Sequence, residues 1–417
     1  MKKIVSLLIV VMMTFGMFSI TFAENATDSI AAVKEKYGLE NLTDYDYTKL
    51  KGKNITINVA NWGEYMSVND SEVLDVNKAF EELTGVNVNY KTVATNEELY
   101  AKLSGSGADY DIIVPSDYMI SRMLQEKMIQ KLDFKNIPNF SLIEDKFKSP
   151  NYDPTNEYSV PYLWGVVCLI YNTKMITDKV DSWDALWNSN YKKDGILMFN
   201  NPRDAFGIAL LRKGYSINTE NKDELKKASE TLKEQKPLVQ AYVMDEIFDK
   251  MVGGSAAIAP YYAGDAVTMV HDNPDLAYVI PKEGTNRFVD GLCIPTNAKN
   301  KEAAEMYINF LCETDIALAN CEYVGYSTPQ KEAFNLLDDE TKNNKIQYPD
   351  DEFLNTKTQA FVNLSDDTNK FVQELWNEIK IDKKTPVWFI PAILVVAIGA
   401  TVFVVLRRAK KKKEDVF

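Results

Sequence analysis

From Asn54 onward, alternating apolar residues and apolar residues spaced three or four apart follow one another along the chain. The first pair is typical, because Ile55, Ile57 and Val59 alternate as in a strand and 69–85 repeat apolar positions as in an amphipathic helix. Strands that alternate with helices predict an α/β fold with a mostly parallel sheet. The same patterns predict strands over 86–90, 110–114, 158–172, 196–199, 256–259 and 291–294, and helices over 95–103, 205–213 and 303–311.

The length of 417 residues is enough for two α/β lobes together with targeting segments. The composition, with 46% apolar and 26% charged residues, is ordinary for a globular protein. The apolar segment 158–172 is long enough to run from one lobe into the next. We therefore expect an α/β protein of two lobes.

The first 53 residues differ from the lobes in composition. Residues 1–23 have the pattern of a secretory signal, with Lys2 and Lys3 before the apolar stretch 4–20 and a plausible cleavage site at 21–23. Residues 24–53 are polar and charged, with room for one short helix, and are interpreted as a spacer.

The end of the sequence has the pattern of a membrane anchor. Residues 387–406 are twenty uncharged residues, and at about 1.5 Å per residue a helix of this length spans a hydrocarbon core of roughly 30 Å. The basic segment 407–417 predicts a cytoplasmic tail, so the lobes are expected outside the cell on a single-pass anchor. The polar stretch 366–384, helical around 371–379, is expected to be the tether.

Charge and histidine content narrow the function. The formal net charge is −13, and the 39 basic and 58 acidic residues of 24–385 give that part about −19, which repels nucleic acid and attracts cations. His271 is the only histidine, which argues against Ser-His or Cys-His catalysis and against histidine-rich metal sites. We expect a binding protein without a cofactor, and not an enzyme.

The four cysteines include no CxxC pair. Cys168 and Cys293 stand in apolar runs that are typical of buried thiols. Cys312 and Cys321 are near enough in sequence to form a disulfide, but their spacing alone leaves that pairing open.

Aromatic, polar and acidic side chains gather in the loops after the predicted strands. Ligands of open α/β sheets bind beyond the carboxyl ends of the strands, so these loops are expected to face one site. The candidates in chain order are Trp62, Glu64, Tyr65, Ser116, Tyr118, Asp204, Tyr262, Asp265, Phe288, Asp290 and Tyr326.

This combination of residue types fits a ligand that carries amines. A primary ammonium group has three donors and needs carboxylate or carbonyl acceptors. A polymethylene chain needs apolar walls, and aromatic faces supply both the wall and a cation–π attraction of about 0.5–2 kcal/mol. The site therefore suits a diamine or polyamine better than a sugar, a peptide or an anion.

Several separated motifs also resemble one family. The runs NWGEY (61–65), YDIIVPSDY (110–118), YSVPYLWG (158–165), IPTNAKNKEAAEMYINFL (294–311) and GYSTPQ (325–330) are similar to the spermidine/putrescine-binding receptors of ABC importers. The resemblance covers about 54–365 in order. It implies a periplasmic-binding-protein-like fold of two lobes with a hinge, a polyamine clamped between the lobes, and the permease subunits of an ABC importer as partner.

The resemblance assigns roles to the candidates, and some positions depart from its pattern. The loops of Trp62, Ser116, Asp204, Asp290 and Tyr326 match ligand positions of the family. Two positions depart from the pattern: Asn201, where spermidine-type receptors usually have Asp, and Asp265, where putrescine-type receptors carry an acid and spermidine-type receptors do not. Tyr262 falls at a Trp position, and Phe288 falls at a Trp-or-Phe position and favours the putrescine type. Gln359 is a candidate for a glutamine ligand, with a spacing that is off by one residue. The choice between putrescine and spermidine stays open.

The resemblance implies lobe boundaries as well. Lobe 1 is expected over 54–162 and 290–325, and lobe 2 over 163–289 and 326–378. The best alternative function is a ferric-ion receptor, because Tyr261 and the adjacent tyrosine could ligate iron together with Asp or Glu.

Overall fold

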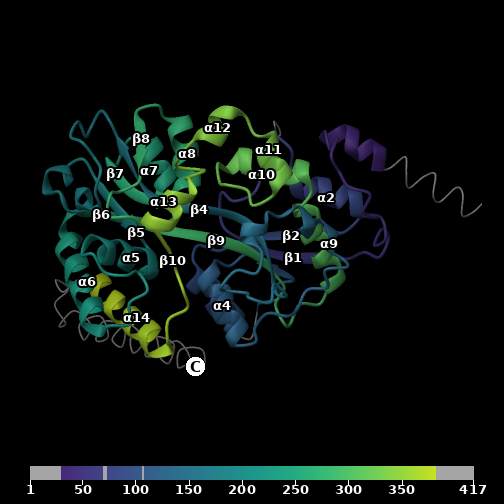
Figure 1. The fold of residues 1–417 in the computed structure, drawn as a ribbon, viewed down its shortest axis with the longest axis horizontal. Coiled ribbons are helices and arrows are strands. Elements are labelled where there is room, and N and C mark those ends of the chain that lie inside the picture. Colours follow the sequence, from purple (N-terminus) through teal and green to yellow (C-terminus); the bar gives the residue numbers. More distant parts are fainter. Residues whose placement is uncertain (1–29, 69–72, 106–107, 382–417) are drawn as a thin grey trace, which may run out of the picture.

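The computed structural model describes residues 30–68, 73–105 and 108–381. Two long antiparallel strands, β4 (Ser159–Asn172) and β9 (Thr285–Cys293), run across the middle of the molecule and belong to both lobes (Figure 1). The described strands form one ten-stranded sheet with the order β2-β1-β3-β9-β4-β7-β5-β6, in which β8 pairs with β4 and β10 with β9. Two of the three positions expected at the hinge, Tyr162 and Asp290, lie in these two strands, and that the lobes move about them stays a prediction.

Lobe 1 is a sheet covered by helices on both faces. Alternate residues of β1 point to opposite faces, so Ile57 and Val59 pack in the core cluster that contains Phe80, whereas Ala60 packs in the cluster that contains Leu99. The elements are β1 (Thr56–Asn61), α2 (Val76–Thr84), β2 (Asn87–Thr92), α3 (Asn96–Ser104), β3 (Ile112–Ile113), α4 (Asp117–Gln125), η1 (Pro138–Leu142), η2 (Asp145–Phe147), α9 (Lys301–Leu311) and α10 (Thr314–Val324).

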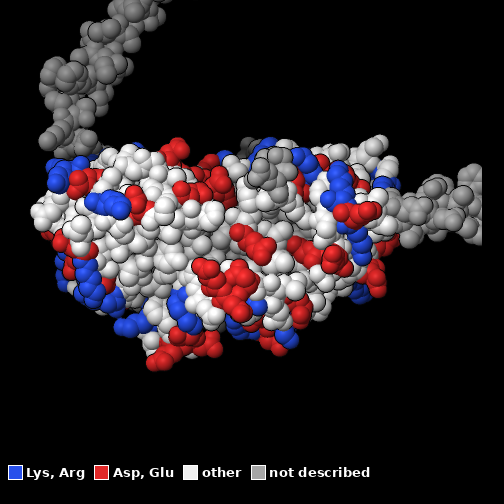
Figure 2. Space-filling model, turned by 90° about the horizontal axis from the view of Figure 1, so that it is seen from above, with Lys and Arg blue, Asp and Glu red and all other residues white. Residues whose placement is uncertain are grey.

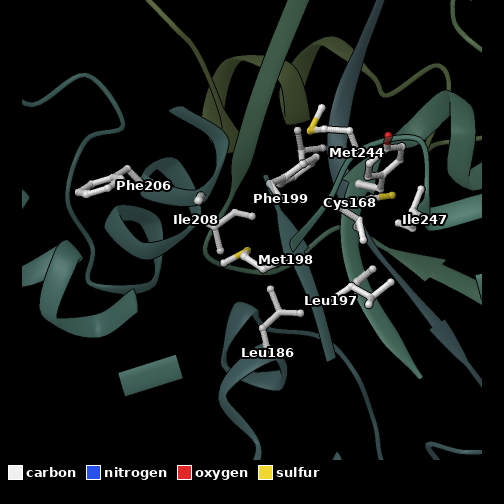
Figure 3. Packing of buried hydrophobic residues seen from close by; sticks show 14 of the residues in the cluster. Cys168, Leu186, Leu197, Met198, Phe199, Phe206, Ile208, Met244 and Ile247 are labelled. Atoms are coloured by element: carbon white, nitrogen blue, oxygen red, sulfur yellow. The ribbon is translucent and has the colours of Figure 1, made fainter. Parts of the chain in front are cut away.

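Lobe 2 is built around a strand that is buried on both faces. Leu197, Met198 and Phe199 of β5 pack among apolar side chains that include Leu186 and Ile208 (Figure 3). The elements are η3 (Trp183–Trp187), η4 (Ser189–Tyr191), β5 (Ile196–Phe199), α5 (Pro202–Arg212), α6 (Lys222–Gln235), η5 (Lys236–Leu238), β6 (Val239–Val243), α7 (Ile247–Val252), β7 (Ile258–Tyr262), α8 (Ala263–Asp272) and β8 (Leu276–Val279). After α10 follow α11 (Lys331–Leu336), α12 (Asp339–Asn343), α13 (Asp351–Lys357), β10 (Thr358–Ala360) and α14 (Asp366–Lys380).

Five of the nine pairings between the described strands are parallel, and the four antiparallel ones involve β4 and β9. The outer strands are parallel, because β1 pairs in parallel with β2 and β3, and β5 with β6 and β7. In the middle, β4 pairs antiparallel with β7, β8 and β9, and β9 pairs antiparallel with β3. The chain crosses between the lobes along β4 and returns along β9, so these neighbouring strands have opposite directions.

The expected fold class is corrected to a two-lobed α/β fold, because the described residues show no membrane-spanning helix. In the described ranges, no helix is both long and apolar enough to cross a membrane. The helix nearest to the predicted anchor, α14, has 15 residues and carries many charged side chains, and its length is only about 22 Å. Residues 387–406 lie outside the described residues, as do 1–23 and 407–417.

The expected tether over 366–384 is also corrected up to residue 381. Helix α14 packs against α5 and α6 of lobe 2, and its buried face includes Val372 and Trp376. The Lys236 ammonium group donates hydrogen bonds to the last carbonyls of this helix, the shortest a 2.7 Å bond to the oxygen of Ile379. Apolar residues on one face therefore make this segment part of the lobe.

The expected spacer 24–53 is corrected from residue 30 onward, because this segment packs on lobe 1. Leu39 and Leu50 are buried in the lobe 1 core. The buried carboxylate of Glu313 accepts a 2.6 Å hydrogen bond from the Tyr47 hydroxyl and a 2.9 Å bond from the backbone N–H of Thr43. A few apolar residues in a polar segment are enough to dock it.

Candidate ligand-binding site

A cavity lies where the strand ends of the two lobes face each other. Lobe 1 contributes the loops after β1, β2 and β3, lobe 2 contributes the loops after β5, β6 and β7, and β9 passes between them. The space between the atoms, counted to the open mouth, is about 680 Å³. A cavity of this size is within the range of small-molecule sites.

Eleven of the thirteen predicted site residues line this one cavity. They are Trp62, Tyr65, Ser116, Tyr118, Asn201, Asp204, Tyr262, Asp265, Phe288, Asp290 and Tyr326. That these residues bind a ligand stays a prediction, but the loops that carry them do meet at one place.

Glu64 and Gln359 are not among the lining residues. Glu64 is exposed, in a loop where its φ angle is 44°. The Gln359 side-chain oxygen accepts hydrogen bonds of 2.9 Å from the Ser216 hydroxyl and 3.2 Å from the backbone N–H of Ile217. The spacing of Gln359 differs by one residue from the family pattern, and its side chain is hydrogen-bonded outside the cavity.

The carboxylates of the site are paired with tyrosine hydroxyls from other elements. Each tyrosine holds its carboxylate in place without neutralising the negative charge, unlike Lys or Arg. The bonds run from Tyr65 to Asp290 (2.6 Å), from Tyr326 to Asp265 (2.7 Å) and from Tyr262 to Asp204 (2.9 Å). Tyr118 also lines the cavity, but it donates a 2.9 Å bond to Glu97, which is not a lining residue.

Burial dominates the electrostatics of these acids. It raises the pKa of Asp204 to about 7 and that of Asp290 to about 6, while hydrogen bonds to each carboxylate act in the opposite direction. Burial also raises the pKa of Asp265 well above its ordinary value. Within the described ranges, none of the three forms an ion pair with Lys or Arg within 4 Å, although the charge of the neighbouring Arg203 lowers the pKa of Asp204.

The cavity acids form two groups, and within each group the charge of one carboxylate raises the pKa of another. The charge of Asp290 raises the pKa values of Asp117 and Asp204, whereas the charge of Asp245 raises that of Asp265. Tyr65 donates to Asp290, and its ring centroid lies 4.6 Å from that of Tyr326, which donates to Asp265, so two tyrosines separate Asp290 from Asp265. The cavity thus has two acidic ends.

Aromatic rings form the wall between the two ends. The ring centroids of Tyr65 and Tyr326 are 4.6 Å apart, and Phe288 lies 6.2 Å from Tyr326 and 5.4 Å from Tyr262. A Cβ atom on Gly264 would lie 2.2 Å from Cδ2 of Tyr326, so only glycine lets this ring approach the start of α8. These contacts fix the rings before any ligand arrives.

Asn201 lines the cavity, but its side chain caps a helix. Its Oδ1 accepts hydrogen bonds from the backbone N–H groups of Arg203 (2.9 Å) and Asp204 (3.5 Å). Helix α5 begins at Pro202, three residues earlier than predicted, which places Asp204 in the first turn. Asn201, which stands where the family pattern has an acidic residue, therefore has a local structural role as a helix cap.

Sequence reasoning missed several lining residues. Asp245 follows β6, a strand that was not predicted, so its loop was not considered. Asn286 precedes Phe288 by two residues in β9, and the alternation of strand residues could have revealed it. Asp117 is the first residue of α4, next to Ser116, and was not among the candidates.

The ferric-ion alternative is not supported. The described part of the chain contains no group of three or more His, Cys, Asp or Glu residues that could hold a metal ion. The Tyr262 hydroxyl donates to Asp204, and burial raises the pKa values of the Tyr261 and Tyr262 hydroxyls, which disfavours the phenolate that iron requires.

The cysteine question is resolved in the structure. Cys312 and Cys321 are buried free thiols and form no disulfide. Cys168 and Cys293 are fully buried in the core, which confirms that prediction. Burial raises the pKa of all four thiols, so they are packing residues here.

Comparison with known proteins agrees with this geometry. Residues 76–349 match the family model for the bacterial extracellular solute-binding proteins. The chain belongs to this family. It is a solute-binding receptor and not an enzyme, as predicted.

Relatives and solved structures within the family are similar over most of the chain. The spermidine/putrescine-binding periplasmic protein of Salmonella typhimurium is 38% identical over 300 residues, which are 71% of this chain and 84% of the relative. A putrescine-binding periplasmic protein of Pseudomonas aeruginosa is 28% identical over 348 residues, 79% of this chain and 93% of the relative. The structure of a spermidine/putrescine ABC transporter substrate-binding protein of Streptococcus pneumoniae has a TM-score of 0.65 at 34% identity and covers 78% of this chain and 99% of that chain.

Proposed function

We propose that this protein is an extracellular receptor that captures a polyamine between its lobes and delivers it to the permease of an ABC importer. The observation that carries the proposal is the cavity with an acidic group at each end and aromatic rings between them. A polyamine has the complementary pattern, with ammonium groups joined by methylene chains. The names of the relatives, which bind spermidine and putrescine, support the same ligand class.

The buried acids give a physical reason for preferring cations. Asp290 is 3% exposed, and its Oδ1 has no hydrogen-bond partner in the protein. An ammonium group that donates to this oxygen forms a charge-assisted hydrogen bond and removes the cost of a buried, unpaired carboxylate. A neutral ligand of the same shape does neither.

The arrangement of acids also bears on the choice of polyamine. Asn201 carries no charge and caps α5, whereas Asp265 places a carboxylate at the other end of the cavity. The acidic groups have therefore moved relative to the spermidine-type pattern. We propose that putrescine binds at least as well as spermidine.

Calorimetric titration tests this function. Putrescine and spermidine should bind, whereas 1,4-butanediol, which has the length of putrescine without its charges, should produce no heat of binding. Equal binding of the diol and the diamine would overturn the proposal, as would the absence of binding by both polyamines. A hundredfold preference for spermidine would overturn only the proposed choice of ligand.

A further inference from the structure

One polar side chain in the cavity has no assigned role. Asn286, Phe288 and Asp290 alternate along β9, and all three line the cavity. The Asn286 side chain is 7% exposed, and its Oδ1 has no hydrogen-bond partner in the protein. A buried amide oxygen without a hydrogen-bond donor costs free energy, and a ligand that donates to it would remove that cost.

The hydrogen-bond donor that Asn286 Oδ1 lacks has to come from the cavity, because the other surroundings of this side chain supply none. Asn286 and Asp204 also border a smaller chamber of about 200 Å³, whose other lining is largely apolar and includes Ile208. The polar groups on that side are engaged, since Trp183 Nε1 donates to the carbonyl of Gly284. A donor for Asn286 therefore has to arrive from the ligand side.

The two other amide side chains predicted for the site are already occupied. The Asn201 oxygen caps α5, and the Gln359 oxygen accepts from Ser216 and Ile217. Asp204 uses Oδ2 to accept from Tyr262, so its second oxygen is left for a ligand. Asn286 is thus a neutral acceptor without a partner that lines both the cavity and the smaller chamber, as Asp204 does.

We propose that Asn286 is a ligand-binding residue that, together with Asp204, accepts hydrogen bonds from one primary ammonium group of the ligand. The inference rests on the proposed function and adds a residue to it. Asp204 supplies the charge, and Asn286 takes a second N–H of the same ammonium. Four residues of strand cover about 13 Å, so Asp290 holds a different nitrogen atom of the ligand.

Asn286→Leu tests the proposal by separating binding from stability. Leucine has a similar volume, removes the unpartnered oxygen and faces an apolar chamber, so the ligand-free protein should unfold at the same or a higher temperature. Affinity for putrescine should fall by about tenfold or more, the usual range for a lost hydrogen bond to a charged group. A purely structural asparagine would instead lose stability with little change in affinity.

A double-mutant cycle with Asp204→Asn tests whether both residues bind the same ammonium. If they do, Asn286→Leu should cost less than about threefold in the Asp204→Asn background, because the shared partner is already weakened. The same fold-change in both backgrounds would overturn the assignment. Asn286→Ala gives the same comparison if the leucine variant does not fold.

The matched control removes an unpartnered buried oxygen elsewhere. The Tyr242 hydroxyl has no hydrogen-bond partner, and Tyr242 is not among the cavity-lining residues, so Tyr242→Phe should leave affinity unchanged. Putrescine binding within threefold of the parent in Asn286→Leu overturns the role of Asn286 and leaves the proposed function standing. If the parent binds neither polyamine, the proposed function fails and the role of Asn286 fails with it.

Discussion

Acidic side chains have opposite electrostatic situations in the cavity and on the outer surface. On the surface, acidic and basic side chains lie near one another toward the margins of the face in Figure 2, and ion pairs such as Lys36–Glu82 (2.6 Å) and Lys131–Glu157 (2.8 Å) are common. In the cavity, Asp204, Asp265 and Asp290 are buried and have tyrosine hydroxyls as partners.

The pKa shifts show what this difference means. A lysine partner lowers the pKa of Glu82 and of Glu157, whereas burial raises the pKa values of Asp204 and Asp290. These surface acids have a lysine as partner, whereas Asp265 and Asp290 have no cation among the causes of their pKa shifts, and Asp204 has only the neighbouring Arg203, which forms no ion pair with it. The cavity is therefore an incomplete electrostatic site that a cationic ligand would complete.

Removing a cavity charge should have the largest effect. Asp290→Asn keeps the volume and the contact with Tyr65 but leaves a ligand ammonium without its carboxylate. Polyamine affinity should weaken by about 2–5 kcal/mol, measured by calorimetry, as for a buried charge pair that loses one member. The surface control Glu157→Gln also removes one negative charge and should bind as the parent does. Equal effects of the two substitutions would remove the distinction between cavity and surface acids.

Acidification should weaken binding by an intermediate amount. Protons compete with the ligand for Asp204 and Asp290, whose pKa values are raised to about 7 and about 6 in the free protein. Lowering the pH from 7.5 to 6 should therefore reduce affinity by about tenfold, measured by titration at several pH values. An affinity that is constant over this range would show that these carboxylates do not hold the ligand.

For the same residues, linkage predicts that acidification raises the stability of the ligand-free protein, although it weakens ligand binding. When the pKa of an acid is higher in the folded protein than in the unfolded chain, where it is near 4, the acid contributes full stability at pH values below 4. For Asp290 and Asp204 this contribution is lost as the pH rises through their folded pKa values of about 6 and about 7. The Asp290→Asn variant, which cannot titrate there, should show a smaller loss of stability over this range in thermal unfolding.

Removing a tyrosine hydroxyl should have the smallest effect. Tyr326→Phe keeps the ring that packs on Gly264 and removes the 2.7 Å hydrogen bond to Asp265. The charged form of Asp265 then loses a stabilising donor, so affinity should fall by about 0.5–1.5 kcal/mol at neutral pH in the same calorimetric assay. A loss as large as that of Asp290→Asn would mean that the hydroxyl itself binds the ligand.

The local sequence pattern was sufficient to predict much of the fold and much of the cavity lining. The alternation of Ile57 and Val59 identified β1, and aromatic and acidic residues after the strands identified most of the cavity lining. These signals are local, because strand periodicity and the position of a loop at a strand end are written in neighbouring residues. The family resemblance added the two-lobed arrangement, which the comparisons show.

Only the tertiary structure decided what depends on distant partners. Asn201 and Gln359 have suitable side chains, but a helix N-terminus and a lobe 2 loop engage them, while Asn286 is left without a partner. The docking of 30–53 depends on Glu313, more than 260 residues away in sequence. Residue type and spacing determine which groups are available, and three-dimensional packing determines which of them remain free to meet a ligand.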